Sequence, residues 1–536
     1  MIETATGGTV KTIDADVVVI GGGSTGAGVA RDAAMRGFRT VLVERGDLGQ
    51  GTTGRFHGLL HSGGRYVVSD PESATECAEE NVILQRIQAD AIEATGGLFI
   101  TAPEDPEEYA DGYVEACIKA NVPVEEITIQ EALRREPQLN RGIKRAFAVN
   151  DGSVDGWKLV WGAAKGAELY GGKTLTYHRV NKIDHKDGQV SAVYCTDRRN
   201  DEEVRIGCHF VLNCAGPWGG EIAAMAGCHD VEVVPGAGIM IAMNHRLTQA
   251  VLNRCIYPED GDILVPAHPV CIIGTTDHMT ESPDDLPIPR QQVQEMLDAG
   301  EIMIPGFRKA RALHAWAGAR PLVKDSRVSV DDTRHMARGM HIIDHYKRDG
   351  VRGFLTIAGG KLTTYRLMAE RIVDLMCEQL GEVRECHTAD EPVPGSENRI
   401  LYKLSHPLKE VETETEAPSG QQIICECELV TRSRLERAME GLADFNLDDV
   451  RRQVRLGMGP CQGGFCASRA AGIAHMEDHV STERASELLR LFLKNRWYGI
   501  WPIVYGEQVR QTALDSWIYE GTFDLEHLPQ PTKEVF

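Results

Sequence analysis

Residues 16–44 read DVVVIGGGSTGAGVARDAAMRGFRTVLVE. The aliphatic run at residues 17–20 predicts a short buried strand, and the glycine-rich stretch at residues 21–28 predicts a turn. Residues 29–36 repeat apolar positions at helical spacing before Gly37, and residues 40–43 predict a second strand. The order strand, turn, helix, strand is typical of an α/β sheet that binds its ligand at the carboxyl ends of its strands.

The glycines of this turn follow the G-x-G-x-x-G pattern as Gly21, Gly23 and Gly26. In that pattern the glycines allow a tight turn, a close approach of the backbone to a pyrophosphate, and close packing of helix on strand. Glu44 ends the second strand at roughly the 20-residue spacing expected for an acid that holds ribose hydroxyls. The pattern predicts a dinucleotide site and disfavours NADP, whereas a purely structural turn is the alternative.

Two later segments repeat the change from strand to small-residue turn. Residues 210–212 run into Ala215 and Gly216, and residues 353–357 run into Gly359 and Gly360 before a helical stretch at residues 363–380. A simple NAD dehydrogenase has no need to return to the nucleotide so late in the chain. We therefore expect FAD, with the second helix facing the flavin ring.

Four cysteines near the C-terminus are spaced as C-x-C and C-x4-C: Cys425, Cys427, Cys461 and Cys466. Two close pairs of thiolates can surround one metal centre, and neighbouring glycines let backbone N–H groups approach the sulfurs. The spacing favours a 2Fe–2S cluster, because structural zinc usually has two to four residues between paired ligands. Zinc and reduced thiols that bind nothing remain the alternatives.

The composition excludes several classes of protein. The chain has 536 residues, is 42% hydrophobic and 25% charged, and carries a net charge of −22. These values are typical of a multi-domain globular protein and argue against nucleic-acid binding. The first sixteen residues lack the apolar region of a secretory signal, and no apolar run is long enough for a membrane helix. Most of the other cysteines stand alone, as expected for reduced thiols in the cytosol.

The domain pattern follows from these motifs. We expect an α/β fold with a Rossmann-like FAD-binding domain of the glutathione-reductase/D-amino-acid-oxidase type, an inserted α+β cap that faces the substrate, and a small Fe–S module. The predicted parts are an oxidoreductase domain at 14–389 (FAD parts about 14–80, 150–232 and 341–389; cap parts about 81–149 and 233–340), a linker at 390–422, a 2Fe–2S module at 423–475 and a helical tail at 476–536.

Several cations stand beside small residues in this acidic chain. Arg65 and Tyr66 follow His61 in a glycine-rich loop, Arg320 lies in GARP, and Lys361 follows Gly360. If these loops converge, they form a pocket for a dianionic phosphate. Each cation alone is more often a surface salt-bridge partner, and His61 alone is more often structural.

Taken together, these motifs resemble the FAD-dependent glycerol-3-phosphate dehydrogenases, above all the large catalytic A subunit of the anaerobic three-subunit enzyme. The resemblance runs through most of the chain and rests on the nucleotide-binding segment and on the stretches GLLHSGGRY, GTTD, GARPL, GGKLTTYRLMAE, CECE, GMGPCQGGFC and RWYGIWPI. The cysteine module is similar to the bacterioferritin-associated-ferredoxin type of 2Fe–2S domain.

The resemblance implies roles for particular residues. The implied catalytic residues are Arg320, Lys361 and His61, and the implied substrate-binding residues are Arg65, Tyr66, Arg320, Arg338 and Lys361. The implied FAD-binding residues are Gly21, Gly23, Gly26, Glu44, Arg45, Thr52, Thr53, Gly54, His61, Ala215, Gly216, Gly360, Lys361, Leu362 and Thr363. Residues 235–239 depart from the aerobic relatives, because they read PGAGI where those enzymes carry a histidine.

The implied activity is oxidation of sn-glycerol 3-phosphate to dihydroxyacetone phosphate by hydride transfer to FAD. Electrons would then pass through the Fe–S centre to two partner subunits, a flavoprotein-like B subunit and an Fe–S, membrane-anchoring C subunit. From these subunits they would reach quinone at the cytoplasmic face of the cell membrane. An FAD-dependent amine or amino-acid dehydrogenase of the same fold is the alternative enzyme. A non-enzymatic Fe–S carrier is the alternative outside enzymes.

Overall fold

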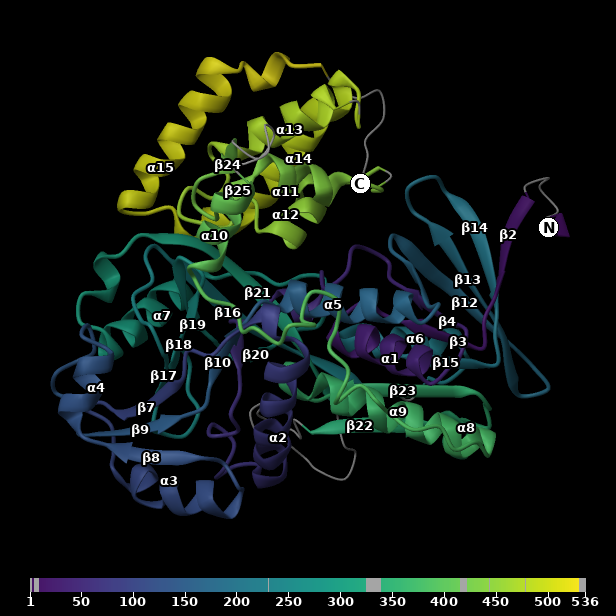
Figure 1. Cartoon of the computed structure of the whole chain (residues 1–536), viewed down its shortest axis with the longest axis horizontal. Helices are drawn as coiled ribbons and strands as arrows, with labels where there is room; N and C mark the ends of the chain where they lie inside the picture. Colours follow the sequence, from purple (N-terminus) through teal and green to yellow (C-terminus); the bar gives the residue numbers. More distant parts are fainter. Residues whose placement is uncertain are drawn as a thin grey trace.

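The computed structural model describes residues 2–3, 9–229, 231–323, 339–414, 422–442, 444–477 and 479–529. Arg338, one of the predicted substrate-binding residues, lies outside these ranges. A mostly parallel sheet with its helices lies beside a large mixed sheet, and a helical C-terminal unit, drawn in green and yellow, sits above both (Figure 1).

The predicted nucleotide-binding sheet has six strands. Its neighbours run parallel, except that β22 pairs antiparallel with β23. The strand order is β11 (Lys173–Leu175), β4 (Thr40–Val43), β3 (Val17–Ile20), β15 (Phe210–Asn213), β23 (Phe354–Gly359) and β22 (Met340–Asp344). The α/β prediction is confirmed, and β3, β4 and β15 are buried along their whole lengths, as expected for central strands covered on both faces.

Helix α1 (Ser24–Met35) begins within the glycine-rich turn, five residues before the predicted helical repeat. Glycine is required where this helix meets the sheet, because a Cβ atom on Gly26 would lie 1.8 Å from the carbonyl oxygen of Gly21. A Cβ on Gly28 would lie 2.8 Å from the ring of Tyr365, at the start of α9 (Tyr365–Leu380). With α5 (Gly156–Leu169), these helices bury one apolar core against the sheet.

The remaining β-structure forms a layer beside the flavin part, antiparallel except where β14 pairs parallel with β2, and a cap. Five strands make the layer: β1 (Ile2–Glu3), β2 (Thr9–Asp14), β14 (Glu202–Gly207), β13 (Gln189–Asp197) and β12 (His178–Lys186). The cap is a nine-stranded mixed sheet: β20 (His278–Met279), β16 (Val233–Met243), β19 (Val270–Gly274), β18 (Ile263–Ala267), β17 (Val251–Arg254), β7 (Gly97–Thr101), β9 (Arg145–Val149) and β8 (Val124–Ile127), with β21 (Ala312–Val323) on β16.

Helices and short strands complete the cap and the oxidoreductase part. The helices are α2 (Pro71–Ile87), α3 (Glu108–Lys119), α4 (Ile129–Arg135), α6 (Gly219–Met225), α7 (Arg290–Met303) and α8 (His345–Asp349). A small sheet joins β5 (Leu59–Leu60), β10 (Gly152–Val154) and β6 (Ile92–Glu93). The cap therefore combines strands with separate helices, as an α+β substrate domain requires.

The cysteine module and the following helices share one hydrophobic core. Leu488, Leu489 and Phe492 of the tail pack with Ile424 and Leu435 of the module. The elements are β24 (Ile423–Cys425), β25 (Val430–Thr431), α11 (Arg432–Met439), α12 (Leu447–Val454), α13 (Cys466–Met476), α14 (Thr482–Ile500) and α15 (Glu507–Ser516). Helix α10 (His406–Glu414) lies in the segment predicted as a linker.

Buried ion pairs from α12 hold this C-terminal unit against the flavin part. Arg452 Nε donates to Asp47 Oδ2 at 2.6 Å, and both side chains are about 5% exposed. Arg455 Nη1 donates to Asp155 Oδ2 at 3.0 Å, while its Nε donates to Glu428 Oε2 at the same distance. Asp155 also caps the N-terminus of α5, and Asp47 lies three residues after Glu44. The two units are therefore joined next to the nucleotide-binding loop.

We expect Arg452→Met to weaken this joint strongly. The substitution leaves Asp47 as a buried carboxylate without its cation, which costs about 3–5 kcal/mol. Urea unfolding followed by tryptophan fluorescence measures the loss. The control is Arg510→Met on α15, whose side chain is 81% exposed and should change the free energy of unfolding by less than about 0.5 kcal/mol. Equal stability of the two variants would contradict the docking role of Arg452.

Candidate functional site

The carboxyl ends of the parallel strands border a cavity of about 370 Å³. Of the predicted cofactor-binding residues, it is lined by Gly21, Gly23, Glu44, Arg45, Thr52, Thr53, His61, Ala215, Gly216, Gly360, Lys361 and Leu362. Gly26, Gly54 and Thr363 do not line it. Gly26 acts through the packing of α1, and buried Thr363 accepts a hydrogen bond from the backbone of His61 at 3.1 Å.

One end of the cavity is suited to a pyrophosphate. The N-cap residue of α1 is Gly23, which has no side chain to cap the helix, and Gly23, Ser24 and Thr25 line the cavity. Ser24 N–H donates to Thr53 Oγ1 at 3.0 Å, which draws the predicted loop of Thr52 and Thr53 onto the helix start. The first turn of α1 contains no acidic residue, and the N-terminus of such a helix favours an anion.

Glu44 closes the nucleotide end. Its Oε2 accepts from Gly22 N–H at 2.7 Å, and its Oε1 accepts from Gly46 N–H at 2.8 Å. Burial raises the pKa of this carboxyl, although both backbone hydrogen bonds lower it. Each oxygen keeps a further lone pair for a ribose hydroxyl, the role predicted for this residue.

Three predicted polar residues meet at the other end of the cavity. Lys361 Nζ lies 4.3 Å above the ring of Tyr66 and 3.7 Å from Asp70 Oδ2. The Tyr66 hydroxyl and His61 Nε2 are 3.4 Å apart. These residues come from the loop after β5 and from the turn before α9, so the structure brings these two distant motifs to one cavity.

Arg320, on β21, lines the same cavity and is tightly held. Its Nη1 donates to Asp277 Oδ1 at 3.0 Å, and its Nη2 donates to Thr275 Oγ1 at 2.9 Å and to the carbonyl of Thr276 at 3.0 Å. A Cβ on Gly238 of β16 would lie 2.6 Å from Arg320 Nη2. The small residues at 235–239, where the aerobic relatives carry a histidine, therefore make room for this guanidinium.

Arg65 does not line the cavity. Its Nη2 contacts both carboxylate oxygens of Asp262, at 2.8 and 2.9 Å, and the Asp262 side chain is fully buried. Arg65 directly precedes Tyr66 in the sequence, so its ion pair with Asp262 holds this loop in place. The structure therefore places Arg65 in a supporting position, separate from the cavity-lining residues that were predicted with it.

Several cavity residues were missed at the level of sequence, among them Arg55 and His57. Neither belongs to a recognisable motif, although His57 stands four residues before His61. His57 Nδ1 accepts from the Leu59 backbone N–H at 3.1 Å, so the neutral ring carries its proton on Nε2. Burial, followed by the charges of Arg65 and Arg320, lowers the pKa of His57 to about 3.

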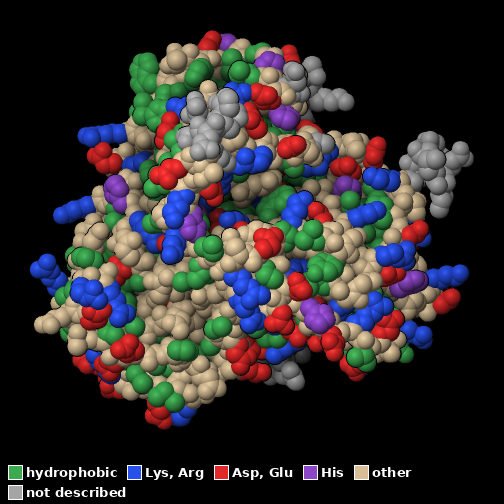
Figure 2. Space-filling model, viewed as in Figure 1, with side chains coloured by type: hydrophobic (Ala, Val, Ile, Leu, Met, Phe, Trp, Pro, Cys, Tyr) green, Lys and Arg blue, Asp and Glu red, His purple; other side chains and the backbone are tan. Residues whose placement is uncertain are grey.

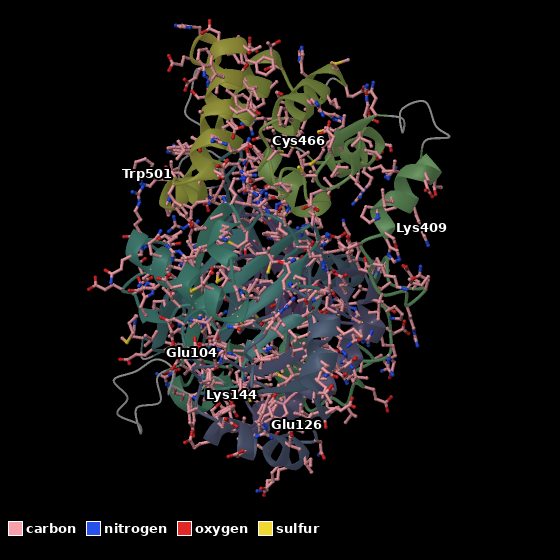
Figure 3. The ribbon with its side chains drawn as sticks, turned by 90° about the vertical axis from the view of Figure 1, so that its left-hand side faces the viewer. Glu104, Glu126, Lys144, Lys409, Cys466 and Trp501 are labelled. Carbon is pink, nitrogen blue, oxygen red and sulfur yellow. The ribbon has the colours of Figure 1, made fainter. Side chains whose placement is uncertain are left out.

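The four predicted ligand cysteines converge in the C-terminal unit, where Figure 3 labels Cys466. Their thiols interact as two pairs, Cys425 with Cys466 and Cys427 with Cys461. Within the described ranges, the one set of three metal-ligating side chains with atoms inside 4.8 Å of one another is Cys228, His345 and Asp349. Both ring nitrogens of that histidine already contact Asp349 and Thr356, at 2.5 and 2.9 Å.

In each cysteine pair one thiol has a lowered pKa and its partner a raised one: Cys461 and Cys425 are lowered, whereas Cys427 and Cys466 are raised. The hydrogen bond with Cys427 lowers the pKa of Cys461 to about 6, and the backbone N–H groups of Gly463, Phe465 and Gly464 act in the same direction. By contrast, burial raises the pKa of Cys271, a thiol far from this loop in the chain, to about 12. Donor groups around sulfur are what an iron–sulfur site requires.

Comparisons with known proteins agree with this site. Residues 16–366 match the family model for FAD dependent oxidoreductases. The chain is 40% identical to the A subunit of anaerobic glycerol-3-phosphate dehydrogenase from Escherichia coli strain K12, over 95% of this chain and 97% of that protein. It is also 40% identical to the A1 subunit of the anaerobic enzyme from Haloferax volcanii, over 96% of this chain and 91% of that protein.

The chain belongs to the family of catalytic A subunits of anaerobic glycerol-3-phosphate dehydrogenases. Glycerol-3-phosphate dehydrogenase from Bacillus halodurans, solved with FAD, has the same fold: the TM-score is 0.63 at 21% identity, over 92% of this chain and 96% of that chain. The cofactor of the family is FAD, and the cavity fits it, because the glycines, the uncapped helix and Glu44 provide the places that a dinucleotide needs.

The low pKa of His57 gives the fold a pH dependence. The folded ring has a pKa of about 3 and the unfolded ring one of about 6.5, so between these values only the unfolded chain binds the proton. Stability is therefore full above about pH 6.5 and falls as the pH is lowered, by about 1.4 kcal/mol per unit. His57→Gln should remove this part of the loss when urea unfolding is compared at about pH 7 and pH 5.

The exposed His185 provides the control. His185→Gln should keep the wild-type slope of stability against pH. If His57→Gln shows the same slope as His185→Gln, the ring of His57 is not held neutral by its burial.

Proposed function

We propose that this chain oxidises sn-glycerol 3-phosphate to dihydroxyacetone phosphate at the FAD site. The observation that carries the proposal is the meeting of Arg320, Lys361, Tyr66 and His61 in the cavity that also fits the dinucleotide. Relatives named for this activity match nearly the whole chain at 40% identity. A pocket with two cations favours a phosphate ester over the amine or amino-acid substrates of the alternative dehydrogenase.

Arg320 and Lys361 would bind the phosphate and orient the substrate. Arg320 presents a planar group held on three sides by Asp277, Thr275 and Thr276, so little freedom is lost on binding. Lys361 adds a compact charge that is fixed above Tyr66. Arg65 would position Tyr66 through its pair with Asp262. Fixed geometry of this kind accelerates a reaction by holding the reacting carbon close to its acceptor.

Bound FAD supplies the acceptor for the hydride from C2. We propose His61 as the base that takes the proton of the C2 hydroxyl, since Tyr66 and the backbone contact with Thr363 hold its ring beside the phosphate-binding cations. His57 is suited to a different task. Its Nδ1 is already engaged and its Nε2 carries the proton, so Nε2 could donate a hydrogen bond to an oxygen of a molecule bound in the cavity.

Arg320→Ala should raise KM for glycerol 3-phosphate while FAD content stays unchanged. Loss of a charge-assisted contact costs about 1.5–3 kcal/mol, so kcat/KM should fall at least about tenfold. Arg320→Lys keeps the charge but not the planar group, so its kcat/KM should lie between those of the wild type and Arg320→Ala. Steady-state kinetics with an acceptor dye and the flavin absorbance measure both quantities. Wild-type kinetics in Arg320→Ala would show that Arg320 only supports the fold.

We further propose that Cys425, Cys427, Cys461 and Cys466 hold a 2Fe–2S cluster. A single tetrahedral zinc would bring all four sulfurs to roughly 3.8 Å of one another. Among these described cysteines, no three sulfurs lie within 4.8 Å, while the thiols interact in two pairs. Two pairs suit two irons joined by sulfide. The cluster would accept electrons one at a time after the two-electron step at the flavin.

The protein purified without oxygen should contain about two irons and two acid-labile sulfides per chain. Cys461→Ala should lose this iron and its visible absorbance, whereas Cys271→Ala, a buried thiol in the cap, should keep both. Metal analysis and sulfide assay provide the measurement. Stoichiometric zinc without labile sulfide would rule out the cluster.

We propose that other subunits carry the electrons onward. Relatives of this chain are named as the A subunit of their enzyme, which supports a multi-subunit assembly. Among the described residues, no helix has the length and apolar character to cross a bilayer. Exposed aromatic residues gather on the C-terminal unit, including Trp497, Tyr498, Trp501 and Trp517, and Figure 2 shows hydrophobic side chains on the left edge of that unit.

In this proposal, two partner subunits hold the chain at the cytoplasmic face of the membrane. One is a flavoprotein-like B subunit and the other is a membrane-anchoring Fe–S C subunit. The isolated chain should reduce acceptor dyes with glycerol 3-phosphate but reduce a long-chain quinone poorly. Addition of the two subunits should restore quinone reduction, measured from quinone absorbance. Equal quinone turnover by the isolated chain would contradict the need for partner subunits.

A further inference from the structure

A second cavity, of about 250 Å³, lies between the flavin part and the C-terminal unit. Its wall combines Trp316 and His314 of β21 with Arg451 of α12 and Arg496 of α14. It adjoins the first cavity, because Arg55 lines both. Figure 2 shows a hollow between the upper unit and the rest of the molecule, with blue Lys and Arg side chains near its rim.

The charges around this second cavity do not balance. Its four arginines are Arg55, Arg451, Arg455 and Arg496, and its three carboxylates are Glu93, Asp155 and Asp448. Each carboxylate already has a cation: Glu93 pairs with Arg246 at 3.0 Å, Asp155 with Arg455 at 3.0 Å and Asp448 with Arg451 at 2.7 Å. Arg55 and Arg496 have no carboxylate within 4 Å in the part of the chain that the structure describes. Two arginines of the wall thus lack a carboxylate partner, and because Arg455 also pairs with Glu428, the cations exceed the carboxylates by one.

Unused hydrogen-bond donors point to the same place. Arg496 Nε and Trp316 Nε1 are buried, and neither finds a partner among the described residues. Both groups can only donate. The Arg496 side chain is anchored through Gln462 Oε1, and the whole residue is 6% exposed. Buried donors are almost always satisfied in folded proteins, so this pair indicates a missing acceptor.

The packing holds these donors in place. The backbone of α14 passes so close to β21 that a Cβ on Gly499 would overlap the His314 ring, whose nearest atom is 1.8 Å away. The His314 and Trp316 rings lie 6.1 Å apart on alternate residues of β21, hence on the same face of that strand as Arg320. Burial lowers the pKa of Arg496 to about 9, with the charge of Arg451 adding to the effect, so a bound anion would favour its charged form.

We propose that this second cavity binds a small oxyanion of the phosphate class, held by Arg55, Arg496 and Trp316. The cavity is large enough for a phosphate or a small phosphate ester, and its leftover charge and donors match the acceptor oxygens of such a group. Because one wall belongs to β21 and the other to α14, the anion joins the flavin part to the C-terminal unit. The proposal does not depend on the substrate of the first cavity.

Phosphate titration of the FAD- and iron-loaded protein by calorimetry tests this proposal. The wild type should bind two phosphates, one in each cavity. Arg320→Ala should lose the site of the first cavity and keep the other, so it provides the background for further variants. In that background Arg496→Gln should abolish saturable phosphate binding.

Trp316→Phe in the same background keeps the ring and removes one donor, so it decides the question even if Arg496→Gln does not fold. It should weaken phosphate binding at least about fivefold. The matched control is Trp161→Phe on α5, which also removes a buried indole N–H without a partner among the described residues, but away from both cavities. Absence of saturable phosphate binding in Arg320→Ala, or equal affinities in the two tryptophan variants, would overturn the proposal.

The same titration separates two sources of the oxyanion. Tighter binding of glycerol 3-phosphate than of inorganic phosphate to Arg320→Ala would identify a site for phosphate esters. Equal or weaker binding would identify a site for free phosphate. If the charge of Arg496 serves only to offset negative charge in the cysteine loop, neither inorganic phosphate nor glycerol 3-phosphate binds to Arg320→Ala. The variants Trp316→Phe and Trp161→Phe then behave alike.

Discussion

The buried ion pair between Arg452 and Asp47 joins the two halves of this molecule. Asp47 belongs to the turn that follows Glu44, so the residue that docks the C-terminal unit is part of the loop that shapes the nucleotide site. Arg455, the residue that follows the end of α12, pairs with Asp155 at the start of α5 and with Glu428 beside Cys427. A charged contact inside the protein is stable only with good geometry, and these three carboxylates supply it.

This arrangement explains how a flavin site and a four-cysteine module fit in one chain. The parallel sheet offers its strand ends to the dinucleotide, and the cap sheet brings Arg320 from the other side. Strand β21 then continues from Arg320 past Trp316 and His314 to α14, which packs on the cysteine module. Strand β21 therefore borders the FAD cavity through Arg320 and contacts, through α14, the unit that holds the four cysteines.

Local sequence determined much of this. The strand at residues 17–20, the glycine turn and Glu44 are predictable because each requirement is local: a glycine that must lack a Cβ, or an acid at the end of a strand. The FAD cofactor is confirmed, because the glycine turn and Glu44 stand at strand ends that meet at one edge of the parallel sheet. Tyr66, Arg320 and Lys361 line the same cavity, and their roles there stay predictions. The resemblance of the motifs added the family, which the comparisons confirm.

Tertiary structure decided the rest, since long-range partners leave no local pattern. Arg65 looked equal to the other cations, but Asp262, far along the chain, turns it away from the cavity. His57 belongs to no recognisable motif. Its low pKa arises from burial and from the charges of Arg65 and Arg320. Gly238 lies in the stretch where the aerobic relatives carry a histidine, and its lack of a side chain leaves room for the Arg320 guanidinium. The sequence by itself determines which groups exist, whereas only the packing decides which face one another and what charge each keeps.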